Sequence, residues 1–239
     1  MRLWIGTSGY SYPEWKGSFY PSDLSAAKMF GYYSERFPTV EINATFYRMP
    51  TDKLVAGWVA QAPAGFRFTL KAPKVITHIK RLKDCADSLS FFLGRADKLG
   101  ASRAALLFQL PPFLKKDVPL LTDFLASVPR EQRAAFEFRN ATWHSDDVYT
   151  ALSDAGAALC VADSEKLTTP LVATAPWGYF RLRDEGYERA DVARWHAQIT
   201  AQKWEEAFVY FKHEDAGKGA QFGVWLKEID AERAASNAT

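Results

Sequence analysis

A chain of 239 residues, with 48% hydrophobic and 24% charged residues, has the composition of a globular protein of one large domain or two small ones. The net charge of +2 argues against a broad basic surface for nucleic acid or membranes. No apolar run approaches the roughly 18 residues of a membrane span, and the stretch after Arg2 is too short for a signal peptide. Cys85 and Cys160 show no pairing pattern, so we expect reduced thiols and a cytoplasmic monomer.

Eight strand-like runs follow one another along the chain. The predicted strands are residues 3–8, 39–46, 67–72, 104–110, 134–139, 158–163, 178–183 and 207–213. Strands that alternate with helices are typical of parallel βαβ units, and eight units in this length predict an α/β fold, a (β/α)8 barrel of the TIM type. The alternative, a doubly wound open sheet, would need a glycine-rich nucleotide fingerprint that is absent after the first strand.

Six helices are expected between the strands, where apolar residues recur at helical spacing. Their stripes lie within residues 29–33, 91–99, 120–125, 148–152, 192–199 and 224–229. Residues 164–176 are expected to form a loop with little helix. We expect a single barrel domain over residues 1–230 and a frayed or disordered tail over residues 231–239.

The strands carry an unusual polar pattern, because "EIN", "TLK", "FQL", "EFR", "RLR" and "FKH" alternate polar with apolar residues where a barrel strand normally has two buried faces. The apolar members are expected to face the helices. The polar members would face the barrel axis: Glu41, Asn43, Thr69, Lys71, Gln109, Glu137, Arg139, Arg181 and Arg183. They lie towards the C-terminal ends of their strands, where barrel active sites form. A charge there costs several kcal/mol unless it is paired, so these groups pair with one another, bind a ligand, or do both.

Two carboxylates, Glu41 and Glu137, come from the second and fifth strands. Paired carboxylates suit acid–base catalysis such as glycoside hydrolysis, and the nearby basic residues would keep both ionised. Either residue is therefore a candidate general base. The alternative is a structural network of salt bridges, for example Glu137 with Arg181.

The basic side chains outnumber the acidic ones at this end of the barrel. Lys71, Arg139, Arg181, Arg183 and Lys212 face Glu41, Glu137 and Asp163, and this positive surplus suits a phosphate or carboxylate ligand. The loop "HEDAGKGA", with Gly217, Lys218 and Gly219, either binds phosphate through backbone N–H groups or is a flexible turn.

Histidines and aromatic residues also follow the strands. His78, His144 and His213 come after the third, fifth and eighth strands, without the spacing of a metal site. We therefore expect no metal and no cofactor, and a ligand-binding role for His78 and His213. Tyr47 and Trp143 are expected to line the cleft.

Several blocks in one order carry a family resemblance: "IGTSGYSYPEWKGSFYP", "FPTVEINATFYRMPT", "FRFTLKAPKVITH", "LLFQLPPF", "AFEFRNATWH" and "VYFKH". The chain resembles the YecE-like family (domain of unknown function 72), which implies a TIM barrel of unassigned function. That fold is similar to those of sugar isomerases and abasic-site endonucleases. The ends of the seventh and eighth strands, "RLRDEG" and "FKHED", differ from the family pattern of His-Gly and paired Asn. Substrate identity therefore does not follow from the resemblance.

The sequence thus favours a metal-independent enzyme, a hydrolase or a lyase or isomerase, that acts on an anionic, phosphorylated or sugar-like small molecule. The alternatives are a nucleic-acid binder or repair-type hydrolase, and a non-catalytic barrel that binds a metabolite. Affinity for DNA that falls steeply with salt would distinguish the first alternative.

Overall fold

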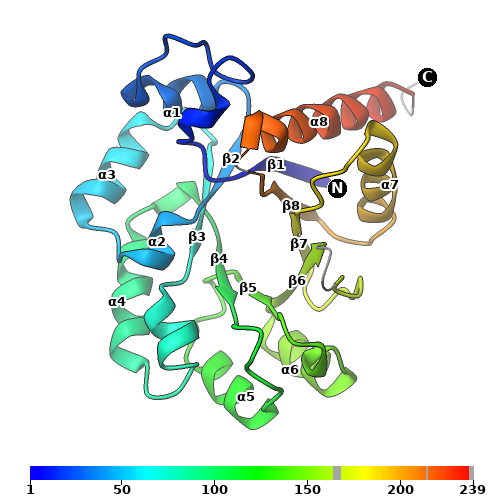
Figure 1. The fold of residues 1–239 in the computed structure, drawn as a ribbon. Coiled ribbons are helices and arrows are strands. Elements are labelled where there is room, and N and C mark those ends of the chain that lie inside the picture. The colour runs from blue at the N-terminus through cyan, green and yellow to red at the C-terminus, as the bar shows by residue number, and fades with distance from the viewer. Residues whose placement is uncertain (164–167, 214, 237–239) are drawn as a thin grey trace.

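The computed structural model is a closed barrel of eight parallel strands, in the order β1 to β8, surrounded by helices (Figure 1). It describes residues 1–163, 168–213 and 215–236. The strands are β1 (Arg2–Ser8), β2 (Thr39–Ile42), β3 (Arg67–Lys71), β4 (Arg103–Gln109), β5 (Ala134–Glu137), β6 (Ala158–Asp163), β7 (Trp177–Leu182) and β8 (Glu206–Phe211). β8 pairs with β1 in parallel and closes the ring. The predicted (β/α)8 barrel is confirmed.

The helices cover the outer face of this ring (Figure 1). They are α1 (Ala26–Ser34), α3 (Asp52–Gln61), α4 (Ala86–Asp97), α5 (Val118–Ala126), α6 (Asp146–Ala155), α7 (Arg189–Thr200) and α8 (Lys218–Ser236). All six predicted helices are present, and α3 is a seventh that the sequence pattern did not predict. Between β6 and β7, the described residues 168–176 contain no helix, and residues 164–167 lie outside the described part. α8 continues past residue 230 to Ser236, and residues 237–239 are also outside the described part.

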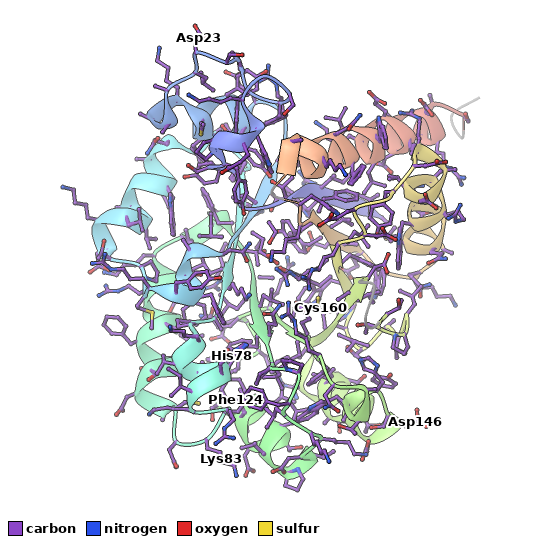
Figure 2. The ribbon with its side chains drawn as sticks, in the orientation of Figure 1. Asp23, His78, Lys83, Phe124, Asp146 and Cys160 are labelled. Atoms are coloured by element: carbon purple, nitrogen blue, oxygen red, sulfur yellow. The ribbon has the colours of Figure 1, made fainter. Side chains whose placement is uncertain are left out.

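The strands separate two apolar layers, one between the barrel and the helices and one inside the barrel. The outward strand residues pack under the helices as predicted: Phe68, Leu70, Phe108, Phe136, Phe138, Phe180 and Leu182. A smaller cluster fills the barrel below its mouth and includes Trp4, Cys160, Tyr179, Phe208 and Tyr210. Figure 2 shows Cys160 within the ring of strands, whereas Phe124 lies at α5, outside it. Strand alternation therefore assigns each side chain to one of two environments.

The second strand ends earlier than predicted. It stops at Ile42, because Asn43 has helical backbone angles (φ −77°, ψ −25°), and the short helix α2 (Ala44–Tyr47) begins at once. Thr45 fixes this turn, since its hydroxyl donates to the carbonyl oxygens of Ile42 at 2.9 Å and Lys71 at 2.6 Å. The prediction of a strand through residue 46 is wrong. The turn instead places Phe46 and Tyr47 above the ends of β2 and β3.

No helix in the described part of the chain has the length and apolar character needed to cross a membrane. Cys85 and Cys160 are both buried and unpaired.

A close contact inside the barrel gives a test of the packing. Gly6 of β1 lies on the same inward row as Trp4 and Ser8, and a Cβ atom there would lie 2.1 Å from the carbonyl oxygen of Thr39. Gly6→Ala should therefore lower the free energy of unfolding by about 3 kcal/mol or more. Gly94→Ala is the matched control, because Gly94 lies within α4 with nothing near its Cβ position. It should raise the free energy of unfolding by about 0.5–1 kcal/mol. Urea unfolding curves measure both changes, and equal stability of the two variants would contradict this packing.

Candidate functional site

The guanidinium group of Arg181 is the centre of the site, and it is fully buried near the C-terminal end of β7. Its Nε and Nη2 lie 3.0 and 2.9 Å from the two carboxylate oxygens of Glu41, and its Nη1 lies 2.5 Å from Oε2 of Glu137. Nη2 also donates to the hydroxyl of Ser8 at 3.2 Å. Every nitrogen of the group donates to the protein. The expectation that Arg181 contacts a ligand is therefore not supported by this geometry.

Glu41 of β2 has no accessible surface and is held from β1 and β7. The hydroxyl of Tyr179 donates to its Oε2 at 2.5 Å, and the hydroxyl of Ser8 donates to its Oε1. The side-chain amide of Asn43 in turn donates to the Ser8 hydroxyl at 2.7 Å. Glu41 thus lies at the bottom of the site, beneath Asn43 at the rim.

Glu137 of β5 is the second anchor, and only 1% of the residue is exposed. Its Oε2 accepts from Nε2 of Gln109 at 2.8 Å as well as from Arg181, and its Oε1 accepts from Nε of Arg139 at 3.0 Å. The Arg139 side chain is 31% exposed, so this guanidinium reaches from the buried network to the open mouth. Its remaining nitrogens can bind a ligand.

Both carboxylates stay ionised in this setting. Burial alone would raise the pKa of Glu41, but the charge of Arg181 and hydrogen bonds from Ser8 and Tyr179 outweigh it and lower that pKa. For Glu137, the charges of Arg181 and Arg139 likewise overcome burial and hold the pKa well below its usual value. Glu41 and Glu137 are both paired with arginines in the structure, as in the charge-pairing alternative. Their lowered pKa values do not support a role as general base.

Lys71 ends β3 and points into the same region, with 7% of the residue exposed. Among the described residues its ammonium group has no hydrogen bond or ion pair, and it lies 4.2 Å from the ring centre of Phe46. Burial and then the positive charge of Arg181 lower the pKa of Lys71 to about 7, against the opposing charges of Glu137 and Glu41. At neutral pH a large fraction of Lys71 is thus a free amine.

A cavity of about 390 Å³ opens directly beside Lys71. Asn43 and Tyr47 line it from the end of β2 and from α2, and Lys212 lines it from the end of β8. Tyr47 is 74% exposed at the rim, which agrees with its predicted place in the cleft. The carbonyl oxygen of the Asn43 side chain is buried and has no partner among the residues described, so it can accept a hydrogen bond from a bound molecule.

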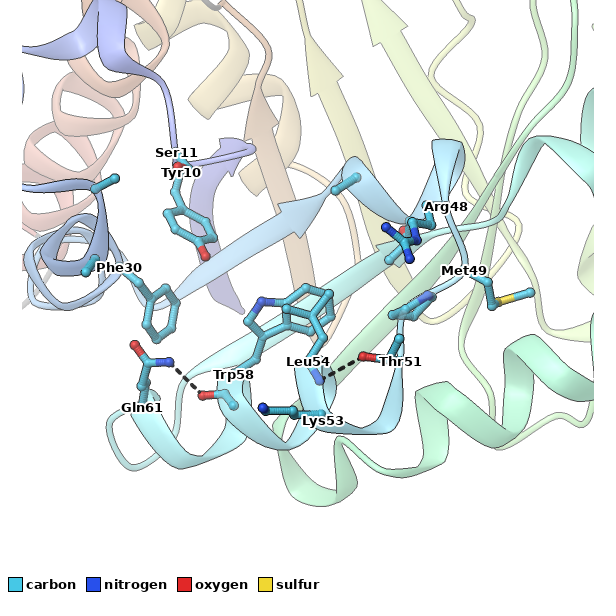
Figure 3. Close-up of a pocket in the computed structure, with 16 residues that line it drawn as sticks. Tyr10, Ser11, Phe30, Arg48, Met49, Thr51, Lys53, Leu54, Trp58 and Gln61 are labelled. Atoms are coloured by element: carbon cyan, nitrogen blue, oxygen red, sulfur yellow. Dashed lines mark hydrogen bonds between the residues drawn. The ribbon is translucent and has the colours of Figure 1, made fainter.

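A second cavity of about 690 Å³ adjoins the first, between α1, α2 and α3 (Figure 3). The two cavities share Tyr10, Ser11, Ala44 and Trp58 in their walls. Its floor is mainly apolar, with Phe30 and Trp58, and Arg48 and Lys53 lie at its edge. A ligand held at Lys71 can therefore extend over α2 towards α3.

The remaining predicted site residues lie at or beyond the ends of β3, β6 and β7. Arg183 is the first residue after β7. Burial lowers its pKa, and the charges of Glu137 and Arg181 also act on it. His78 packs edge-on against Phe46, and burial and the charge of Lys71 lower its pKa. Asp163 accepts a hydrogen bond from Tyr187 at 2.6 Å and belongs to that pair.

Two predicted ligand residues lie elsewhere. Trp143 is fully buried, stacks on Phe138 with 4.8 Å between ring centres, and donates its Nε1 proton to the carbonyl of Leu114. His213 packs against Phe222 of α8. Both belong to the layer between barrel and helices, so their predicted contact with a ligand is a mistaken inference. Residues that follow a strand can turn outward as easily as inward.

The glycines after β8 also serve packing. A Cβ atom on Gly217 would lie 2.5 Å from the Ser18 hydroxyl, and one on Gly219 would lie 3.1 Å from the His213 carbonyl oxygen. These contacts explain why glycine occupies both positions, so a phosphate site is not needed to account for them. No group of three potential metal ligands comes together within the described ranges, and the three histidines after the strands do not form one.

Sequence reasoning missed two members of the ion network, Ser8 and Tyr179. Tyr179 occupies the inward position two residues before Arg181, so alternation along β7 contained the necessary signal. Ser8 is the last residue of β1 and pairs in register with Glu41 of β2. Only that register places its hydroxyl against the carboxylate.

Comparison with known sequences gives a family but no activity. Residues 4–237 match the family described as "Protein of unknown function DUF72". The chain is 32% identical over 139 residues to UPF0759 protein YecE of Escherichia coli, covering 58% of this chain and 48% of that protein. It is 29% identical over 155 residues to UPF0759 protein YunF of Bacillus subtilis, covering 62% and 54%. The matched part spans about half the length of these relatives.

Solved structures agree with the fold. A DUF72 family protein from Thermotoga maritima superposes with a TM-score of 0.87 at 26% identity, over 97% of this chain and 100% of the other. A DUF72 family protein from Enterococcus faecalis gives a TM-score of 0.80 at 18% identity, over 95% and 94%, which shows the shared fold alone.

The buried ion network yields a stability prediction. Arg181→Met leaves two carboxylates buried without their common partner, which should lower the free energy of unfolding by about 3–5 kcal/mol at pH 7. The depressed pKa values of Glu41 and Glu137 stabilise the folded wild type above their unfolded values near pH 4.5, and this contribution is lost as the pH falls further. The difference between the variant and the wild type should therefore shrink below pH 4.5. Urea unfolding from pH 7 to pH 3 measures it. A pH-independent difference would show that Arg181 acts through packing alone.

Lys71 yields a prediction of opposite pH dependence. Its pKa of about 7 lies below the ordinary 10.5, so the unfolded chain binds more protons between these pH values. The buried ammonium form thus costs stability in full below pH 7, and the cost disappears as the pH rises towards 10.5. In chloride buffer, Lys71→Met should stabilise the protein at pH 6 by at least about 2 kcal/mol, since one pKa unit corresponds to ~1.4 kcal/mol. The gain should decline towards pH 10. Lys74→Met, at an exposed position, is the control, and an equal response of both variants would rule out the effect.

Proposed function

Because the chain belongs to the DUF72 family, whose function is unknown, the site itself must indicate the activity, and we propose that the barrel mouth binds a small anionic molecule on which the protein acts as an enzyme. One observation carries the proposal. Within the described part of the chain, Lys71 lines the cavity without an ion pair, and Arg183, which also has none, lies where the charges of Glu137 and Arg181 act on it. The carboxylates nearby are already neutralised by Arg181 and Arg139. A basic side chain buried without a counter-ion is costly to ionise, and an anionic ligand supplies the missing charge.

The roles differ among the basic residues. Arg183 and the exposed nitrogens of Arg139 hold the anion. Lys71 and Lys212 line the cavity of about 390 Å³. Arg181 positions the site from below through Glu41 and Glu137. The same positive surplus repels a metal cation, which favours chemistry carried by side chains.

The size of the opening favours a small molecule over nucleic acid. A cavity of about 390 Å³ accommodates a metabolite-sized ligand, and the adjoining apolar cavity accommodates a ring or chain attached to it. Binding to a phosphate backbone requires many surface cations, whereas the whole chain carries a net charge of only +2. Retention on DNA with a steep salt dependence would favour the nucleic-acid alternative.

Anion binding predicts a specific thermal stabilisation. Phosphate at one hundred times its Kd stabilises the folded protein by about 2.7 kcal/mol, or roughly 5–10 °C in Tm for a chain of this length. Chloride at equal ionic strength should have a much smaller effect. Arg183→Gln should lose more than half of the phosphate increment, because its guanidinium contributes directly to the anion site.

Arg233→Gln removes the same charge from an exposed position on α8 and is the matched control. It should keep the full increment. Equal stabilisation of the wild type by phosphate and chloride, or an unchanged increment in Arg183→Gln, would refute the proposed anion site.

A further inference from the structure

The amine of Lys71 differs from an anion-binding ammonium in how it is placed. Its backbone is fixed at the end of β3, where its carbonyl oxygen accepts from the Thr45 hydroxyl at 2.6 Å. Its side chain is buried up to the wall of the 390 Å³ cavity, which it lines. Its Nζ rests 4.2 Å from the centre of the Phe46 ring. The end of β3 thus presents the Lys71 amine to the cavity.

The surroundings favour the neutral form of this amine. Arg181 and Arg139 both repel a proton on Nζ, and the carboxylates that would attract one are already bound to those guanidinium groups. Burial and these charges bring the pKa of Lys71 to about 7. An amine that is desolvated beside another cation is the type of lysine that reacts with carbonyl compounds.

Other nucleophiles near the barrel axis are less suitable. The Cys160 thiol is fully buried below the mouth, and burial raises its pKa well above the usual value. The Ser8 hydroxyl is 2% exposed and donates to Glu41. Lys71 combines a nucleophilic atom with access to the cavity.

We propose that Lys71 forms an imine with an aldehyde or ketone group of the anionic molecule, while Arg183 and Arg139 hold its phosphate or carboxylate. This inference rests on the proposed anion site. The substrate class is therefore a small oxo acid or a phosphorylated carbonyl compound, and the second cavity takes any further part of it.

The covalent step balances without an additional reagent. The lone pair of Nζ attacks the carbonyl carbon, a C–N bond forms, and the carbonyl oxygen takes a proton to give a carbinolamine. The nitrogen then expels the hydroxyl group with one solvent proton as water, which leaves a protonated imine. Amine, carbonyl and one proton thus become iminium and water. The iminium withdraws electrons from the adjacent carbon, as aldol cleavage, dehydration or decarboxylation requires.

Pyridoxal 5′-phosphate is a suitable probe, because it carries an aldehyde and a phosphate on one small ring. The protein is incubated with the probe at pH 7, reduced with borohydride, digested and analysed by mass spectrometry. Lys71 should be labelled at least about tenfold faster than exposed Lys74, because roughly half of an amine with a pKa of about 7 is neutral at this pH, against well under ~1% of an ordinary lysine. Inorganic phosphate should slow the labelling of Lys71, and pyridoxal without the phosphate should react more slowly there.

The outcomes separate the two proposals. If phosphate raises Tm but Lys71 is labelled no faster than Lys74, the anion site stands and the imine proposal is refuted. If Lys71 is labelled rapidly but phosphate neither competes nor raises Tm, the anion site fails, and with it the proposed substrate class. Peptide mapping of the wild type decides between these results without any variant. Lys71→Met should abolish the fast phase, and Lys74→Met should retain it.

Discussion

One buried guanidinium determines how the mouth of this barrel is built. Arg181 binds two carboxylates from different strands, and a charge of this kind is stable inside a protein only when its partners are fixed and its hydrogen bonds are complete. Tyr179 and Gln109 complete the shell around the carboxylates. The result is a rigid, nearly neutral layer across the barrel, and within the described ranges Lys71 above it has no ion pair.

Lys71 shows the consequence of that layer. A carboxylate free to pair with it would keep its amine protonated, but Arg181 and Arg139 occupy the carboxylates nearby. The same ion pairs that stabilise the barrel therefore favour a neutral amine beside the cavity. α2 covers one side of this amine, since its Phe46 ring centre lies 4.2 Å from Nζ. The structural ion pairs and the amine proposed to react are therefore parts of one arrangement.

Much of this arrangement follows from local sequence patterns. Strand alternation identified the barrel and the inward position of Glu41, Lys71, Glu137 and Arg181, because successive side chains along a strand point to opposite sides of the sheet. The pairing of Arg181 with both carboxylates depends on side-chain reach across the barrel, which no local pattern contains. The orientation of Trp143 was mispredicted for a related reason, since alternation need not continue far beyond a strand end. The turn at α2 was missed because its hydrogen bond from Thr45 reaches another strand.

The ionisation of Lys71 is the property on which the proposed imine chemistry depends, and NMR can follow it directly. Protein labelled with ¹³C at lysine Cε can be titrated from pH 5 to pH 11, with Lys71→Arg to assign the resonance. One lysine should titrate about three pH units below the others, near pH 7, and added phosphate should move its midpoint upward. If every lysine titrates near its ordinary pKa of 10.5, Lys71 is an ordinary ammonium group, and the account of a reactive amine above a neutral ion layer is wrong.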